Sequence, residues 1–108
     1  MEKKYKRVYI AGKYNDDNII GCLNNIKIGI QKCTEILHEG DFIPFCPWTD
    51  FLFQFFNEGL TIEDYYKYSM AWLEVSNEVW VLPNYETSKG TLKEIERAKE
   101  LNIKVKYL

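Results

Sequence analysis

The most informative stretch of the sequence for chemistry is the loop before its last amphipathic segment, Ser88-Lys89-Gly90-Thr91. Small residues there let backbone N–H groups approach a ligand, and the N-terminus of the helix that follows favours an anion. A phosphate group or a sugar hydroxyl would suit this loop. The same residues also fit an ordinary helix start, in which Ser88 caps the first turn and Gly90 permits a tight turn. On local evidence alone the ordinary interpretation is favoured.

Glu94 lies one turn into the same predicted helix. The helix dipole keeps a carboxylate there ionised, and its side chain can point back towards the loop. If it faces a bound sugar, this carboxylate could attack the anomeric carbon or stabilise an oxocarbenium ion. The alternative is an exposed glutamate that pairs with Lys93 or Arg97, and such an exposed position is what we expect for Glu96 and Glu100.

A second candidate loop, Gly12-Lys13-Tyr14-Asn15, follows an apolar run that contains Tyr9. Lys13 could contact a phosphate, and Tyr14 could stack on a base. The alternative is a turn marked by Gly12 with exposed polar side chains. With a single glycine, the stretch has neither a dinucleotide fingerprint nor a phosphate loop. Nicotinamide cofactors and ATP hydrolysis are therefore disfavoured, and we expect no cofactor.

The chain has three cysteines, Cys22, Cys33 and Cys46, and one histidine, His38. They show no metal-ligand spacing, and an odd number of cysteines does not form a closed disulfide framework. No general base lies near Cys46 in the sequence, which disfavours thiol catalysis. We therefore expect no metal site, and we interpret the cysteines as small buried side chains in a reducing compartment.

Aromatic residues make up 16% of the chain, and six of them lie close together, five of these in the segment 46–60, which has no clean period. Such a cluster could wall a base-binding pocket, form a subunit interface or pack on the core as a lid, because aromatic residues are enriched at all these places. The pattern does not decide among these alternatives. The six residues are Phe45, Trp48, Phe51, Phe53, Phe55 and Phe56.

The elements that position these residues alternate between strand and helix. Runs of β-branched and aromatic residues predict strands at 7–11, 42–45, 78–82 and 103–107. Steps of three and four between apolar residues predict three helices. The first starts at an N-cap among residues 15–17 and ends at Gly40, the second runs from a capping arrangement at 61–64 to about 76, and the third covers 90–101.

Two predicted helices carry a clear apolar stripe that we expect to be buried. In the first helix the stripe consists of Ile19, Leu23, Ile26, Ile30, Cys33 and Leu37. In the last helix it consists of Leu92, Ile95 and Ala98.

This order predicts a three-layer α/β fold, flavodoxin-like or Rossmann-like, with a parallel sheet of about four strands. In such sheets ligands bind at the carboxyl ends of the strands, where the strand order reverses. If strands 7–11 and 78–82 are neighbours, the loops 12–15 and 84–90 meet at that edge. The architecture thus predicts one site between the two candidate loops.

The length of 108 residues predicts one domain, residues 1–108. Its 14 basic and 16 acidic residues give a net charge of -2, which provides no electrostatic reason to bind a long nucleic acid. No run approaches the roughly 20 apolar residues of a membrane span, and the start lacks the apolar core of a secretory signal. We expect a cytoplasmic protein that does not bind membranes.

Two blocks taken together resemble a known family over nearly the whole chain. The first is Val8-Tyr-Ile-Ala-Gly12, and the second runs from Leu82 to Ala98 with Ser-x-Gly at 88–90 and a glutamate four residues after Gly90. Both resemble the nucleoside 2-deoxyribosyltransferase-like superfamily and, within it, the small DUF4406-type proteins of phages and bacteria.

The resemblance implies a role for several positions. Glu94 matches the nucleophile that attacks C1′ of a deoxyribonucleoside and expels the base, and Ser88 matches a serine that binds a 5′-phosphate. Residues from Tyr9 to Tyr14 would line the pocket. Members of the family are dimers or larger assemblies whose sites are often completed by a neighbouring subunit, so we expect a homodimer or a higher homo-oligomer.

The sequence departs from the family pattern at two positions in the implied pocket. Ser69 stands where the active enzymes carry an aspartate that orients the glutamate and handles the proton on the departing base; a serine is a poor acid at neutral pH. Asp64, five residues earlier, points elsewhere on a regular helix. Trp48 stands where related proteins often have histidine.

Three hypotheses follow. The chain cleaves or transfers the N-glycosidic bond of a deoxyribonucleoside or its 5′-monophosphate, with Glu94 as nucleophile. Alternatively, it binds and sequesters a nucleotide or nucleotide signal in the same pocket without turnover. In the third, it is an oligomeric interaction protein whose aromatic segment forms the interface and whose pocket is vestigial.

Overall fold

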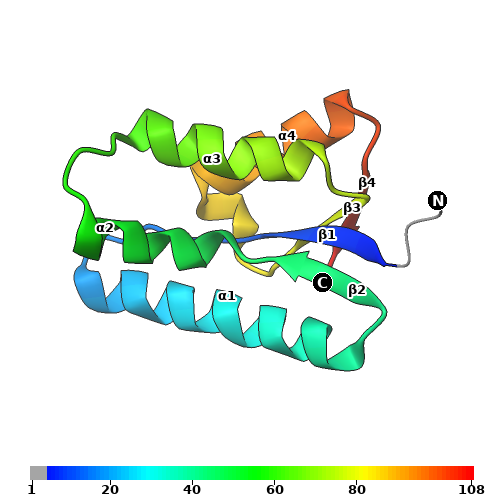
Figure 1. The fold of residues 1–108 in the computed structure, drawn as a ribbon, viewed down its shortest axis with the longest axis horizontal. Helices are drawn as coiled ribbons and strands as arrows, with labels where there is room; N and C mark the ends of the chain where they lie inside the picture. Colours follow the sequence, from blue (N-terminus) through cyan, green and yellow to red (C-terminus); the bar gives the residue numbers. More distant parts are fainter. Residues whose placement is uncertain (1–4) are drawn as a thin grey trace.

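A computed structural model describes residues 5–108, whose four strands form one parallel sheet (Figure 1). The strand order is β2-β1-β3-β4. Because β1 pairs with both β2 and β3, the strand order reverses at β1 and β3. The predicted α/β class, its parallel sheet and the neighbourhood of the first and third strands are confirmed. The strands are β1 (Lys6–Ala11), β2 (Phe42–Phe45), β3 (Glu78–Val81) and β4 (Lys104–Tyr107).

Helices cover both faces of this sheet, which makes three layers. Figure 1 shows α1 and α2 on one side and α3 and α4 on the other. The segment 46–60, which has no clean period in the sequence, folds into two short helices and a loop. The helices are α1 (Ile19–Glu39), the 3-10 helix η1 (Pro47–Leu52), α2 (Phe53–Phe56), α3 (Ile62–Glu74), the short 3-10 helix η2 (Tyr85–Thr87) and α4 (Lys89–Glu100).

Strand β1 contributes to both halves of the core because its side chains alternate between the two faces of the sheet. Val8 and Ile10 pack on the α1 side, where the buried Cys33 also lies. Tyr9 and Ala11 pack on the other side against residues of α3 and α4. These four residues of β1 are fully buried, as expected for the central strand of a parallel sheet.

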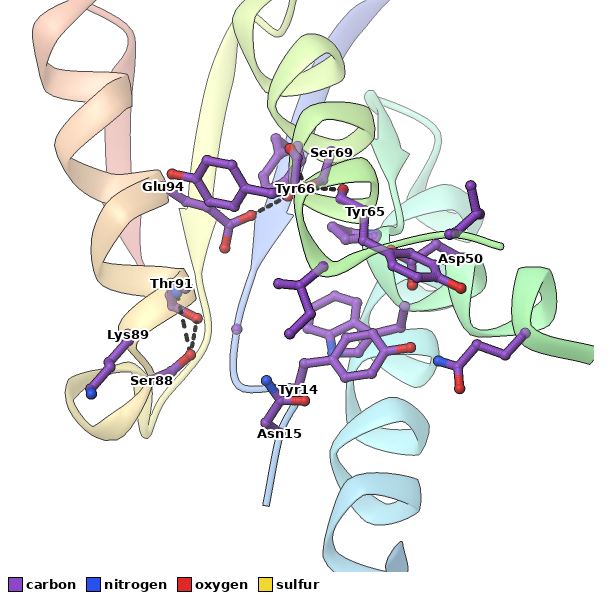
Figure 2. Close-up of a pocket in the computed structure, with 18 of the residues that line it drawn as sticks. Tyr14, Asn15, Asp50, Tyr65, Tyr66, Ser69, Ser88, Lys89, Thr91 and Glu94 are labelled. Carbon is purple, nitrogen blue, oxygen red and sulfur yellow. Dashed lines mark hydrogen bonds between the residues drawn. The ribbon is translucent and has the colours of Figure 1, made fainter. Parts of the chain in front are cut away.

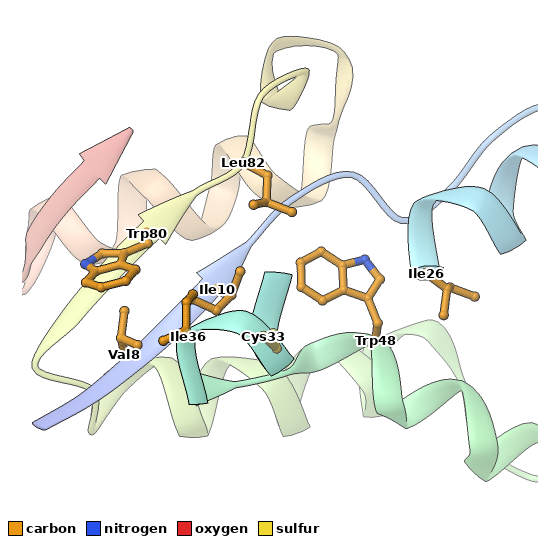
Figure 3. Close-up of a cluster of buried hydrophobic side chains, with 8 residues drawn as sticks. All are labelled: Val8, Ile10, Ile26, Cys33, Ile36, Trp48, Trp80 and Leu82. Carbon is orange, nitrogen blue, oxygen red and sulfur yellow. The ribbon is translucent and has the colours of Figure 1, made fainter. Parts of the chain in front are cut away.

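Trp48 is the largest fully buried side chain, and it joins η1 to α1 (Figure 3). It lies directly over Gly29, where an added Cβ would come within 2.2 Å of indole carbon Cδ2. Its Nε1 donates a hydrogen bond to the carbonyl of Lys13 at 3.1 Å. Gly29, in the middle of α1, therefore leaves the space that this indole occupies, and the contact fixes which side of α1 faces the core.

The prediction of the buried face was wrong for much of α1. The buried residues are Ile26, Gly29, Cys33 and Ile36. Four members of the predicted stripe are exposed: Ile19, Leu23, Ile30 and Leu37. The reason is the packing of Trp48 on α1, because the helix turns its Gly29 side towards the indole. In α4, likewise, Leu92 is exposed and Thr91 is buried in its place, while Ile95 and Ala98 are buried as predicted.

The helix ends follow the sequence signals with one exception. Gly40 ends α1 in the left-handed region at φ 89°, a conformation that glycine adopts without a Cβ penalty. Thr61 and Asp64 form the predicted capping box at the start of α3. The N-cap of α1, however, is Asn18 and none of residues 15–17: its side chain accepts a hydrogen bond from the Gly21 N–H at 2.8 Å.

Among the helices of residues 5–108, none combines the length and the apolar composition that crossing a bilayer requires.

Candidate active site

A pocket of about 820 Å³ opens at the carboxyl ends of β1 and β3, the edge that the topology predicts (Figure 2). Both candidate loops contribute to it, together with η1, the loop between α2 and α3, and α3 itself. Pockets that bind small molecules have volumes in this range. The lining includes Tyr9, Gly12, Tyr14, Trp48, Asp50, Glu58, Leu60, Ile62, Tyr65, Tyr66, Ser69, Ser88, Lys89, Gly90, Thr91 and Glu94.

Glu94 lies in the wall of this pocket on α4 and is half-buried. Its Oε2 accepts a hydrogen bond from the hydroxyl of Tyr9. The alternative of an exposed ion pair does not apply, because Arg97 pairs with Glu74 and with Glu100, at 3.0 and 3.1 Å. The structure thus turns the carboxylate of Glu94 towards the sheet and the pocket.

Burial dominates the electrostatics of Glu94. Removal from water raises the pKa of its carboxyl group to about 7, and the negative charge of Asp50 adds to this rise. The hydrogen bond from Tyr9 acts in the opposite direction and lowers the pKa. Near neutral pH both the acid and the carboxylate are therefore populated, which suits a group that takes part in proton transfer.

Tyr9 is fully buried and connects Glu94 to α3. Burial raises the pKa of its phenol well above the usual value, so the hydroxyl keeps its proton and acts as a donor to Glu94. Ser69 hydrogen-bonds to the same phenol and lowers its pKa. The hydroxyl of Ser69 also donates to the carbonyl of Tyr65 at 3.2 Å. Ser69 therefore lies beside the Tyr9–Glu94 pair, at the position where the resemblance implies an aspartate.

Asp64 does not take the place of that aspartate. Its side chain accepts a hydrogen bond from the N–H of Thr61 at 2.9 Å, within the capping box. This bond lowers the pKa of Asp64 and keeps it ionised. Asp64 is not among the residues that line the pocket.

Ser88 caps α4 and lines the pocket at its first turn. Its hydroxyl oxygen accepts hydrogen bonds from the N–H of Thr91 at 3.3 Å and from the Thr91 hydroxyl at 2.8 Å, so the ordinary cap interpretation is confirmed. Gly90 also lines the pocket, and an added Cβ there would meet nothing within 4 Å. Free space thus adjoins the helix N-terminus, where backbone N–H groups have no intrahelical partner.

The loop 12–15 contributes some of its predicted residues to the pocket and not others. Gly12 is needed for close approach, since an added Cβ would lie 2.9 Å from Leu82 and 3.0 Å from Trp48. The ring of Tyr14 lies in the pocket (Figure 2). Lys13 does not line the pocket, because its backbone turns towards Trp48 and receives the indole hydrogen bond.

Of the six clustered aromatic residues, only Trp48 lines the pocket. The others pack elsewhere: Phe45 stacks on Tyr9, and Phe51 lies edge-on to Phe55. The remaining aromatic wall of the pocket consists of tyrosines from β1, the loop 12–15 and α3: Tyr9, Tyr14, Tyr65 and Tyr66.

Asp50 is a site residue that no sequence pattern predicted. It lies on η1, lines the pocket and is only 7% exposed. Burial raises the pKa of its carboxyl group to about 6, and a hydrogen bond from Tyr14 partly offsets this rise. The signal for Asp50 in the sequence is a single acidic residue between the aromatic residues Trp48 and Phe51. The segment around it has neither helical nor strand periodicity.

Comparison with known families finds a match to the domain of unknown function DUF4406 over residues 6–107. Because this match spans nearly the whole chain, the chain belongs to the DUF4406 family. The DUF4406 part of the predicted resemblance is thereby confirmed, while the wider superfamily stays a prediction. No curated protein matches the chain.

Proposed function

We propose that this DUF4406 protein cleaves or transfers the N-glycosidic bond of a 2′-deoxyribonucleoside or its 5′-monophosphate, with Glu94 as the nucleophile. The observation that carries the proposal is the placement of Glu94: its carboxylate lies in a pocket of nucleotide size and is held by Tyr9. A fixed carboxylate beside a sugar is the group that glycosyl chemistry requires, and the wider resemblance supports the same role.

In the proposed reaction, the carboxylate of Glu94 attacks C1′ as the bond from C1′ to the base breaks. The Tyr9 hydroxyl orients the carboxylate through its hydrogen bond. Water then attacks C1′ in hydrolysis, or the nitrogen of a second base attacks in transfer, and Glu94 is released. No cofactor takes part in either step.

The N-terminus of α4 supports the binding of a 5′-phosphate. Ser88 and Gly90 line the pocket there, and the dipole of the helix favours a negative charge. Because Glu94 is one turn further along the same helix, a phosphate at Gly90 would place the sugar between the phosphate and the nucleophile. We assign the phosphate to the turn around Ser88 and Gly90 and not to Lys13.

The proposed active form is a homodimer or a larger assembly. Four apolar side chains support this: Phe55 and Phe56 of α2 and Leu60 and Ile62 of the segment that follows, here called the apolar rim. Ile62 is 88% exposed and Phe56 82%, far more than isolated folding favours for such residues. Leu60 and Ile62 also line the pocket, so a second copy on the rim would help to enclose the ligand.

Two observations favour binding without turnover as the second candidate function. Ser69 provides no acid beside Glu94, and the raised pKa of Glu94 leaves part of it protonated at neutral pH. A protonated carboxyl group is a poor nucleophile. Such a protein would hold the same ligand in the same pocket and release no base.

The test is release of free base from each 2′-deoxyribonucleoside and each 5′-monophosphate, with and without a second base as acceptor. We expect the wild type to release base and Glu94→Gln to release none above background. Glu96→Gln, an exposed glutamate on the same helix, is the matched control and should keep full activity. If the wild type and Glu94→Gln are equally inert while nucleotides still raise their melting temperatures, the binding function replaces the catalytic one.

A further inference from the structure

Asp50 lines the pocket and carries a buried polar atom that has no partner. Its side chain is 93% buried, and Oδ1 has no hydrogen-bond partner within residues 5–108. A buried carboxyl oxygen without a partner costs free energy of about 1–3 kcal/mol, so such atoms are rare in folded proteins. The atom is therefore explained best by a partner that arrives with the ligand.

Tyr14 is the polar neighbour of Asp50 in the pocket wall. A hydrogen bond from Tyr14 to the carboxyl group lowers its pKa, while Oδ1 has no partner within residues 5–108. Burial raises the pKa of Asp50 to about 6, so it is protonated far more often near neutral pH than an exposed aspartate. A protonated carboxyl group donates one hydrogen bond and accepts another, and this pattern matches the ring nitrogen and amino group of a nucleobase.

Asp50 and Glu94 reach the pocket from opposite sides (Figure 2). Glu94 comes from α4, together with the proposed phosphate end of the pocket. Asp50 comes from η1, next to the ring of Tyr14 and on the same short helix as Trp48. A nucleotide that places its sugar at Glu94 would thus extend its base towards Asp50 and these aromatic rings.

Few other acids could serve at this position. Within residues 5–108 the pocket wall carries three carboxyl groups, those of Asp50, Glu58 and Glu94. Glu58 is exposed, and Glu94 is assigned to the sugar. Ser69 is a poor acid at neutral pH, and its hydroxyl also hydrogen-bonds to backbone carbonyls of its own helix.

We propose that Asp50 binds the base and gives it a proton as the N-glycosidic bond breaks; this rests on the proposed function. An oxygen of Glu94 bonds to C1′, the C1′–N bond breaks, and its electron pair passes to the base. The proton of the Asp50 carboxyl group moves to a base nitrogen, so the base departs neutral and Asp50 becomes a carboxylate. When water attacks C1′ and displaces Glu94, the proton that the water loses returns to Asp50.

The leaving group of the substrate separates this role from a structural one. A natural deoxyribonucleotide needs a proton on its base, whereas 4-nitrophenyl 2-deoxyriboside 5-phosphate releases a stable phenolate without one. We expect Asp50→Asn to slow release of the natural base by about 100-fold or more and release of nitrophenolate by less than about 10-fold. Glu94→Gln should abolish both reactions, and the exposed control Asp41→Asn should change neither.

Each other outcome overturns the proposal in a recognisable way. Equal losses on both substrates would make Asp50 a structural residue, and unchanged rates would remove it from the reaction. If the wild type releases neither leaving group, the proposed function itself fails and the role of Asp50 in catalysis fails with it. Asp50→Ala, which also lacks the acidic proton, is measured in parallel, so that the comparison of leaving groups does not depend on a single variant.

Discussion

At the scale of single residues, Asp50 and Glu94 place two carboxyl groups in one pocket at a cost to stability. Burial raises the pKa of Asp50 from 3.8 to about 6 and that of Glu94 from 4.5 to about 7. Folding therefore favours the protonated forms, and the folded chain binds more protons than the unfolded chain between these values. The resulting stability is present below about pH 4 and is lost as the pH rises through 6 and 7.

Removal of either charge should therefore stabilise the protein in alkaline solution. At pH 8 we expect Glu94→Gln and Asp50→Asn each to increase the free energy of unfolding by about 1–3 kcal/mol, because a neutral amide costs less to bury than a carboxylate. At pH 4 the gain should nearly vanish. Urea unfolding at both pH values measures this, with Glu96→Gln and Asp41→Asn as exposed controls. A gain that is the same at both pH values would contradict burial of charge as its cause.

Glu94 and Asp50 also show which site residues a sequence pattern can predict. Glu94 follows a recognisable loop at a fixed distance on a periodic helix, so its place could be predicted. Asp50 lies on a short 3-10 helix whose burial depends on Trp48 packing against Gly29 of α1. That contact joins segments far apart in the chain, and no local pattern encodes it. The strands and helix ends were predictable because local patterns encode them. The buried face of α1 was not, because it depends on the same contact between Trp48 and Gly29.

At the scale of an element, the first turn of α4 is both a helix start and the proposed phosphate site. Its glycine is not required by packing, because an added Cβ at Gly90 meets nothing within 4 Å. Alanine is a better helix former than glycine by up to about 1 kcal/mol. A glycine that lowers the stability of its helix and lines a pocket is consistent with space kept for a ligand.

Gly90→Ala should therefore move stability and binding in opposite directions. We expect a small rise in melting temperature and a loss of several-fold in affinity for deoxynucleoside monophosphates, with little change for the matching nucleosides. Isothermal titration with both ligands measures the difference, at low and high salt. Gly59→Ala is the matched control, since Gly59 also has free space around it and does not line the pocket. Equal losses for nucleoside and monophosphate would place the phosphate elsewhere.

At the scale of the whole molecule, two exposed apolar surfaces compete as the interface of the proposed assembly. One is the apolar rim, at the end of the molecule where α2 leads to α3 (Figure 1). The other lies on α1, where Ile20 is 68% exposed and Leu23 is 45% exposed. Only the rim is continuous with the pocket, through Leu60 and Ile62. Burial of the rim by a second copy would therefore couple assembly to ligand binding, whereas burial of the α1 surface would not.

Substitutions on the two surfaces should separate these arrangements. We expect light scattering to find the wild type as a dimer or larger, and the double variant Phe56→Ser, Ile62→Thr as a monomer with weaker nucleotide affinity. Both side chains are exposed in the single chain, so the fold should lose less than about 0.5 kcal/mol per site. The matched variant Ile20→Thr, Leu23→Thr should remain associated and keep its affinity. If it is this variant that becomes monomeric, α1 forms the interface and each pocket belongs to one subunit alone; if the wild type is itself a monomer, the rim serves another purpose.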